Sequence, residues 1–361
     1  MKRVFKQSIL RVKPYVPGKP IDEVKRELGL KDVIKLASNE NPFDPSPEVF
    51  KAIQNGLKEL NRYPDGDCYY LRRELASRLK VNQKQLIFGN GSDEIIVFAA
   101  RAFLKEGDEV VIAKPSFLIY EIASEIEGAE IKAVPLKDFR YDLEGMKKAV
   151  SPKTKIIFIG NPDNPSGMYL TENQVREFLK AIPSNILIFM DEAYHEYVQA
   201  KDYVNSIQLL KEYKNLIVTR TFSKLYGLAA LRVGYGIGSE ELMDYLNRLR
   251  EPFNVNSLAQ AAALACLKDE RYYQGLLKKI NEERQFLYRS FQRLGLKYIE
   301  SCTNFILIDL PKEAVELAKK LLQQGIIVRD MSPWGLKRFI RVTIGTPEEN
   351  KRLIEELEEL V

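Results

Sequence analysis

Between residues 85 and 237, short apolar segments alternate regularly with segments of helical pattern. The apolar segments read QLIF, EVVIAKPSF, EIKAVPL, KIIFIGNP, ILIFMDEAY, LIVTRTFSK and VGYGIG, and segments such as TENQVREFLKAI lie between them. Such alternation is typical of parallel sheets, in which a helix connects each strand to the next. The sequence therefore predicts an α/β fold, with a mainly parallel, doubly wound sheet that carries helices on both faces.

The chain changes character on both sides of this region. Residues 1–30 contain the proline-rich segment KPYVPGKP and are expected to form an extended arm that ends in a short helix. After Pro252 the pattern changes to long helices, four further strands and two more helices. We therefore expect three parts: an N-terminal arm (1–30), a large domain that contains the parallel sheet (31–245) and a smaller α+β domain (246–361).

Composition argues against several classes of function. The net charge of +5 is spread along 361 residues, so nucleic acid is not an expected partner. No segment has the apolar length of a membrane span, and the start MKRVFKQSIL lacks the apolar core of a signal peptide. The single histidine, His195, and three isolated cysteines do not favour a metal site. We expect His195 to be structural and the protein to be cytoplasmic.

Polar residues follow three successive apolar strands at the point where each strand ends. Asn164 follows KIIFIG, Asp191 ends ILIFMD, and Lys224 follows LIVTRTF. Open parallel sheets bind ligands at the carboxyl ends of their strands, so these three residues predict one shared site. The turn GNGS (Gly89–Ser92) joins a strand to a helix and offers unpaired backbone amides to an anion.

The segment Thr219–Tyr235 reads TRTFSKLYGLAALRVGY. A lysine just past a buried strand is costly to desolvate unless it is paired or used chemically, and Schiff-base formation is its main chemical use. The hydroxyls of Thr221 and Ser223 and the guanidinium of Arg232 suit a phosphate group. Taken singly, Lys224 can equally be a surface lysine, and Asp191 a helix cap.

Three motifs together resemble those of the fold-type I, pyridoxal-phosphate-dependent (class II) aminotransferases. They are NPDNPSG (Asn161–Gly167), DEAY (Asp191–Tyr194) and TFSKLYGLAALRVGY, and their order and spacing agree over essentially the whole chain. The resemblance implies pyridoxal 5'-phosphate as cofactor. It also implies that Lys224 anchors the cofactor covalently and moves the proton, that Asp191 pairs with the ring nitrogen, and that Asn164 and Tyr194 hold the ring oxygen.

The same resemblance assigns the remaining cofactor contacts. Phe117, where the family often has tyrosine, would stack on the cofactor ring, because the π face is retained. Tyr63 in NRYPDG would reach the phosphate of the neighbouring subunit, which implies a homodimer with shared sites. The cofactor phosphate would be held by Gly91, Ser92, Asp93, Thr221, Ser223 and Arg232.

Segments of the arm and the tail resemble the histidinol-phosphate aminotransferases within this family, namely PYVPGKP, LASNENPF, NRYPDG, VRD and RVTIGTPEEN. The implied reaction is a transamination between L-histidinol phosphate and 2-oxoglutarate that yields imidazole acetol phosphate and glutamate, a step of histidine biosynthesis. Arg341 would clamp the carboxylate of glutamate. Arg329, with Tyr15 and Asn39, would receive the phosphate of histidinol phosphate.

Several alternatives stay open at this stage. Arg341 can be an exposed cross-strand partner, and Arg329 a solvated residue at a strand end. The resemblance also accommodates a broad aromatic amino acid aminotransferase or a lyase similar to threonine-phosphate decarboxylase. A regulator that senses the cofactor would need a DNA-binding module, and no helix-turn-helix pattern precedes residue 30.

Overall fold

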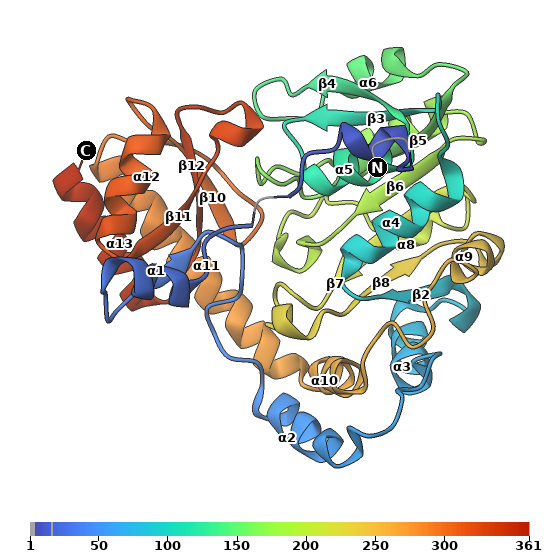
Figure 1. Ribbon diagram of the computed structural model, residues 1–361, viewed down its shortest axis with the longest axis horizontal. Helices are drawn as coiled ribbons and strands as arrows, with labels where there is room; N and C mark the ends of the chain where they lie inside the picture. The colour runs from blue at the N-terminus through green and yellow to red at the C-terminus, as the bar shows by residue number, and fades with distance from the viewer. Residues whose placement is uncertain (1–3, 16, 361) are drawn as a thin grey trace.

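The larger of the two sheets follows the predicted alternation of strands and helices (Figure 1). The structure is a computed structural model that describes residues 4–15 and 17–360. Within them, the seven strands of this sheet have the order β2-β8-β7-β6-β5-β3-β4. Neighbours from β4 to β7 are parallel, and β8 runs antiparallel to β7 and β2. The mainly parallel sheet is therefore confirmed. Its strands are β2 (Leu86–Gly89), β3 (Glu109–Lys114), β4 (Glu130–Pro135), β5 (Thr154–Gly160), β6 (Leu187–Asp191), β7 (Leu216–Thr221) and β8 (Gly234–Ile237).

Helices cover both faces of this sheet because its central strands are apolar throughout, so that apolar side chains point to both faces. Ile157 and Ile188 belong to one core, whereas Ile156 and Phe189 belong to a second core on the opposite face. The first core is completed by α6 (Leu143–Ala149), α7 (Glu172–Ala181) and α8 (Ser206–Leu209). The second is completed by α4 (Ser92–Phe103), α5 (Leu118–Ile126) and α9 (Glu240–Asn247).

The smaller sheet has the order β1-β11-β12-β10-β9 within the described residues. Strand β1 is parallel to β11, and the other pairs are antiparallel. The range 31–245, expected to form the large domain, thus includes a strand that pairs in the smaller sheet, and the division into domains stays a prediction. The elements of this lobe are α1 (Ile21–Leu28), β1 (Ile34–Leu36), β9 (Lys297–Ile299), β10 (Phe305–Asp309), α12 (Ala314–Gln323), β11 (Ile326–Asp330), β12 (Phe339–Thr343) and α13 (Pro347–Leu360).

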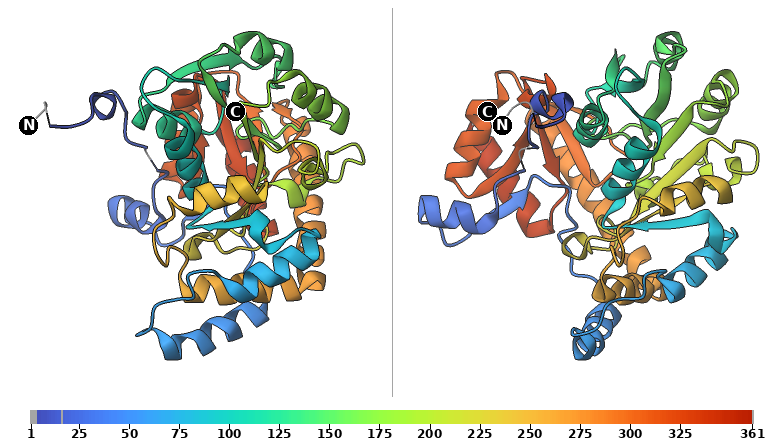
Figure 2. Two further views of the ribbon diagram at one scale, coloured as in Figure 1. Left: turned by 90° about the vertical axis from the view of Figure 1, so that its right-hand side faces the viewer. Right: turned by 45° about the vertical axis from the view of Figure 1, so that its right-hand side comes forward.

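A long helix connects the two lobes. It is interrupted at Asp269, in the charged segment KDER, between α10 (Ser257–Lys268) and α11 (Glu270–Arg293). Helix α10 packs on α2 (Pro47–Gly56) and α3 (Tyr69–Leu79), and α11 runs from there to the smaller lobe. The right-hand view of Figure 2 shows the smaller lobe, largely in orange and red, beside the larger lobe.

Short 3-10 turns lie at several connections. They are η1 (Gln7–Leu10), η2 (Leu57–Glu59), η3 (Gln83–Gln85), η4 (His195–Tyr197), η5 (Ala229–Leu231) and η6 (Ser332–Trp334). The arm begins on the larger lobe, because the hydroxyl of Ser8 donates to the carbonyl of Ile126 over 2.9 Å. The arm ends in the predicted short helix, α1, and Gly29 (φ 68°) caps the C-terminus of this helix. No helix of the described residues combines the length and apolarity that a bilayer crossing requires.

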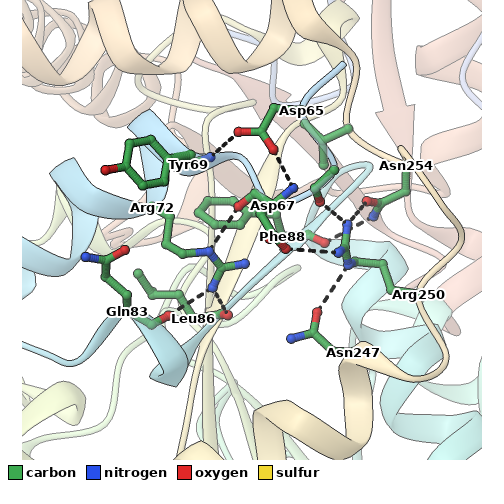
Figure 3. A network of polar contacts seen from close by, with 12 residues as sticks. Asp65, Asp67, Tyr69, Arg72, Gln83, Leu86, Phe88, Asn247, Arg250 and Asn254 are labelled. Atoms are coloured by element: carbon green, nitrogen blue, oxygen red, sulfur yellow. Dashed lines mark hydrogen bonds and ion pairs between the residues drawn. The ribbon is translucent and has the colours of Figure 1, made fainter. Parts of the chain in front are cut away.

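Two arginines fix the turn of residues 62–67 against the larger lobe (Figure 3). The Arg72 guanidinium donates to the carbonyls of Leu86 at 2.6 Å and Asp67 at 3.0 Å. Arg250 donates to the carbonyl of Gly66 at 2.6 Å and to Asn254 Oδ1 at 3.0 Å. Because each arginine binds more than one segment, the turn has a defined position on the surface of the molecule.

Candidate functional site

The carboxyl ends of β5, β6 and β7 open into one cavity between the lobes. Asp191 is the last residue of β6, and Asn164 and Lys224 follow β5 and β7. All three line a cavity of about 230 Å³. With the exception of Gly91 and Tyr63, every residue predicted for the site lines this cavity: Tyr15, Asn39, Ser92, Asp93, Phe117, Asn164, Asp191, Tyr194, Thr221, Ser223, Lys224, Arg232, Arg329 and Arg341.

Asp191 is a buried carboxylate that several donors hold in place. Its Oδ2 accepts a hydrogen bond from the Tyr120 hydroxyl at 2.9 Å, and its Oδ1 accepts one from the backbone N–H of Ala193 at 3.2 Å. Burial raises the pKa of Asp191 to about 6, although these hydrogen bonds favour the ionised form. A carboxylate so placed can bind a cationic N–H group that enters the cavity.

Tyr120 belongs to the site, and our sequence reasoning did not identify it. It lies on α5, and its ring stacks on Phe158 with centroids 4.8 Å apart. The available signal was its position three residues after Phe117, one turn of helix away. The rings of Phe117 and Tyr120 meet edge to face at 5.5 Å, so the predicted stacking residue rests on the residue that holds Asp191.

Lys224 is half-buried and points toward an aromatic ring. Its Nζ lies 5.5 Å from the centroid of the Tyr194 ring. Within residues 4–15 and 17–360, no carboxylate lies within 4 Å of this amine. The Tyr194 hydroxyl accepts a hydrogen bond from Asn39 Nδ2 at 2.9 Å, and Asn39 N–H donates to Thr343 Oγ1 at 2.9 Å. An amine without a counter-ion in a cavity is available for covalent chemistry.

An anion cradle lies where α4 begins. The backbone of Gly91 is left-handed (φ 85°), and a Cβ atom there would lie 2.2 Å from Arg232 Nη2. Glycine therefore allows the Arg232 guanidinium to approach the start of the helix. Arg232 Nη2 donates to Asp93 Oδ1 at 2.8 Å, and Nη1 lies 3.5 Å from Ser223 Oγ. Cation, hydroxyl and helix N-terminus together suit a phosphate group.

Arg341 is buried, with 6% of its surface exposed, so the alternative of an exposed cross-strand arginine is wrong. Its guanidinium donates to Asn164 Oδ1 and, at 3.1 Å, to the carbonyl of Ala37. Its buried Nε has no partner among the described residues. Burial lowers the pKa of Arg341 to about 10, and the positive charge of Arg329 acts in the same direction. A buried guanidinium with an unused donor is a binding group for an anion.

Arg329 lies beside Trp334, a second residue that sequence reasoning missed. The Arg329 guanidinium lies 4.9 Å from the centroid of the Trp334 ring. Both residues also line a larger cavity of about 890 Å³, which continues from the site along the arm. Tyr15 lines both cavities and is 45% exposed.

Tyr63, unlike Gly91 at the start of α4, lies on the surface away from the cavity. It is 82% exposed, and its ring stacks on Phe253 at 4.8 Å. Its predicted role involves a second subunit, so its position in one chain leaves that role a prediction. His195 lies outside the cavity too, and its Nδ1 lies 3.2 Å from the carbonyl of Glu192.

The chain is similar to known aminotransferases over nearly its whole length. The family model for aminotransferase class I and II matches residues 31–357. A histidinol-phosphate aminotransferase of Moorella thermoacetica is 48% identical over 99% of this chain and 92% of that protein. The corresponding protein of Brevibacillus brevis is 49% identical over 99% of this chain and 98% of the relative.

Solved structures agree with this fold. The histidinol-phosphate aminotransferase of Sinorhizobium meliloti, crystallised with pyridoxal-5'-phosphate, superposes with a TM-score of 0.91 at 29% identity. The match covers 99% of this chain and 98% of that chain. Thermus thermophilus aspartate aminotransferase, at 19% identity and a TM-score of 0.86 over 99% of both chains, shares the fold.

Proposed function

Because the chain belongs to the class I and II aminotransferase family, we propose that it transfers the amino group of L-histidinol phosphate to 2-oxoglutarate. The products are imidazole acetol phosphate and glutamate, in a step of histidine biosynthesis. The main support is the identity of 48–49% to histidinol-phosphate aminotransferases over almost the whole chain. The placement of two arginines over one cavity supports a pair of anionic substrates.

The residues of the cavity fit pyridoxal 5'-phosphate. They offer an amine without a counter-ion at Lys224 and a buried carboxylate at Asp191. They also offer the anion cradle at the start of α4, where the absence of a side chain at Gly91 leaves room for Arg232. When bound, the cofactor supplies an aldehyde that condenses with amines and a ring that accepts electrons from the substrate α-carbon. Ser92, Asp93, Thr221, Ser223 and Arg232 would hold its phosphate.

Lys224 acts first as the covalent anchor and then as the base. As a free amine, its Nζ would take the proton from the substrate α-carbon. The position of Nζ near the Tyr194 ring would keep the amine inside the cavity. Asn164 and Tyr194 would hold the ring oxygen of the cofactor, and Phe117 would cover one face of the ring.

Asp191 keeps the ring nitrogen protonated. It can do so only when ionised, and the hydrogen bonds from Tyr120 and Ala193 favour that form against the effect of burial. Beside a cationic ring nitrogen, the pKa of Asp191 would be lower than in the empty cavity, because opposite charges stabilise each other at short distance. The carboxylate therefore stays ionised at neutral pH in the loaded enzyme.

The two arginines receive the anionic groups of two different substrates in turn. Arg341, buried and with an unused donor, suits the α-carboxylate of glutamate. Arg329 and Tyr15 both line the two cavities, and Arg329 suits the phosphate of histidinol phosphate, which would enter from the arm side. Asn39 donates to the Tyr194 hydroxyl, and both residues line the same cavity as the two arginines.

We also propose a homodimer with shared sites. Large apolar side chains that are exposed in the single chain gather around α2, α3 and the segment after α9. A second copy that covers them would bring Tyr63 to the partner's cofactor phosphate. These side chains are Phe50, Leu57, Leu60, Tyr63, Tyr69, Tyr70 and Phe253. A cytoplasmic location is proposed on the basis of three free cysteines.

A panel of amino donors tests the substrate. The purified protein, loaded with pyridoxal phosphate, is given histidinol phosphate, phenylalanine or tyrosine together with 2-oxoglutarate, and glutamate is measured. Histidinol phosphate is expected to give the highest kcat/KM. A preference for the aromatic amino acids would favour the broad aminotransferase, and release of carbon dioxide without glutamate would favour the lyase.

A further inference from the structure

The single tryptophan of the chain, Trp334, has a fixed position directly after strand β11. The backbone N–H of Ser332 and its hydroxyl donate to Asp330 Oδ1 at 3.0 and 2.7 Å. The backbone N–H of Trp334 donates to the carbonyl of Met331 at 3.0 Å. These bonds hold the turn η6 in a set geometry relative to the strand that carries Arg329.

The indole of Trp334 makes two contacts at the site, one within the smaller lobe and one to the larger lobe. Its face lies 4.9 Å from the Arg329 guanidinium, which is cation–π distance. Its Nε1–H donates to the carbonyl of Ser116 at 3.1 Å. Ser116 precedes Phe117 in the larger lobe, so one side chain of the smaller lobe contacts both the arginine and the segment of the expected ring-stacking residue.

Arg329 needs such support because of its neighbour on the next strand. Its Cα pairs directly with that of Arg341, and like charges that face each other across two strands repel. A long side chain that is repelled by its neighbour adopts other rotamers unless a contact restrains it. The flat, electron-rich ring of Trp334 supplies a restraint of the appropriate chemistry.

We propose that Trp334 is a positioning residue for the phosphorylated substrate. It holds the Arg329 guanidinium over the cavity, where that group receives a phosphate ester, and couples it to the Phe117 segment. The proposal rests on the proposed function for the identity of the substrate. The geometric relation between Trp334 and Arg329 can be tested without that identity.

A second aromatic contact between the lobes provides a matched control. Phe139 and Phe339 meet with ring centroids 5.2 Å apart, and Phe339, on β12, lines neither cavity described above. Phe339→Leu weakens a contact between the lobes without touching Arg329. If Trp334 served only to join the lobes, Phe339→Leu and Trp334→Leu would have the same effect on KM.

Steady-state kinetics distinguish these two roles. Trp334→Leu is expected to raise the KM for histidinol phosphate roughly five- to tenfold, with kcat within about twofold of the wild type. Trp334→Phe retains an aromatic face and should recover most of the loss, and Phe339→Leu should leave KM unchanged. A KM for Trp334→Leu within twofold of the wild type, or an equal rise in Phe339→Leu, would overturn the proposal.

Tryptophan fluorescence of the loaded enzyme tests the same relation with inorganic phosphate as the probe. Emission is expected to change saturably with phosphate in the wild type, not with chloride at equal ionic strength, and not in Arg329→Gln. Absence of the change, or its persistence in Arg329→Gln, overturns the inference. A wild type that shows the phosphate response but does not transaminate histidinol phosphate refutes the proposed function and leaves the inference supported.

Discussion

Arg329 and Arg341 lie directly opposite each other on the antiparallel strands β11 and β12. Two cations in this arrangement repel, and one of them, Arg341, is buried. An anion that binds between or beside them offsets this cost. The folded protein is therefore more stable when the cavity holds a carboxylate or phosphate than when the cavity is empty.

The first prediction concerns the stability that the protein gains when an anion binds at this pair of arginines. Phosphate at ten times its dissociation constant should stabilise the wild type by about 1.4 kcal/mol, because it binds only the folded state. Arg341→Gln and Arg329→Gln should each lose most of this increment. The measurement is thermal unfolding of the loaded enzyme in phosphate and in chloride at equal ionic strength. Equal increments in all three proteins would contradict the assigned roles.

The second prediction concerns Tyr63 and the shared site. Tyr63→Phe keeps the ring on Phe253 but removes the hydroxyl, and should weaken retention of the cofactor about tenfold. A mixed dimer of Tyr63→Phe and Lys224→Ala chains contains one site with both residues intact. At limiting cofactor, the transaminase activity of the mixed dimer should therefore exceed the summed activities of the two parent proteins.

The control is each parent protein mixed with itself after the same dissociation treatment. If Tyr63 served the site of its own chain, both sites of the mixed dimer would be defective. The absence of any gain on mixing would thus refute the exchange of Tyr63 between subunits.

The third prediction concerns Tyr120. Its hydrogen bond to Asp191 favours the ionised carboxylate, so Tyr120→Phe should raise the pKa of Asp191 above its value of about 6. The phenylalanine ring keeps the stack on Phe158. Cofactor affinity is measured by absorbance titration from pH 5 to 8. As the pH is lowered, the affinity of the variant should begin to fall at a higher pH than that of the wild type. An unchanged pH profile would show that Tyr120 does not tune Asp191.

The fourth prediction concerns Asp163, a buried carboxylate in the segment NPDNPSG. Burial raises its pKa to about 6, and it accepts hydrogen bonds from Ser166 and Tyr141. Its folded pKa exceeds the unfolded value of 3.8, so protonation favours folding below about pH 4, and this stabilisation is lost as pH rises through 6.

The comparison with Asp163→Asn isolates this effect, because asparagine does not titrate. The free energy of unfolding of the cofactor-free wild type, minus that of the variant, should fall between pH 4 and 7. Urea unfolding at several pH values measures the difference. A difference that is constant or rises with pH would contradict the assigned pKa.

Much of the site could be predicted from the sequence because its residues follow strands that are apolar throughout. Asn164, Asp191 and Lys224 occupy fixed places at strand ends, and the parallel sheet brings those ends to one edge. The fold class was predictable for the same reason. Strand β1 lies in the range expected for the large domain but pairs with β11 in the smaller sheet, and the sequence did not indicate this partner because a three-residue strand has no pattern that specifies which sheet it joins.

Trp334, Tyr120 and the burial of Arg341 could not be read from the sequence. The direction of the Trp334 ring depends on a 3-10 turn whose position is set by strand β11. The Tyr120 hydroxyl meets Asp191 across 71 positions of sequence, and only the packing of α5 on the sheet brings them together. The alternating pattern around Arg341 fits an exposed or a buried face equally well, so its burial depends on the lobe opposite.

The most direct test of the account is to locate the covalent attachment of pyridoxal phosphate. The purified protein is incubated with the cofactor, reduced with borohydride, digested and analysed by mass spectrometry. We predict one phosphopyridoxyl group per chain, attached to Lys224, and none in Lys224→Ala, whose transaminase activity should also be lost. A label on another lysine, or an unlabelled Lys224 in an active enzyme, would contradict the account.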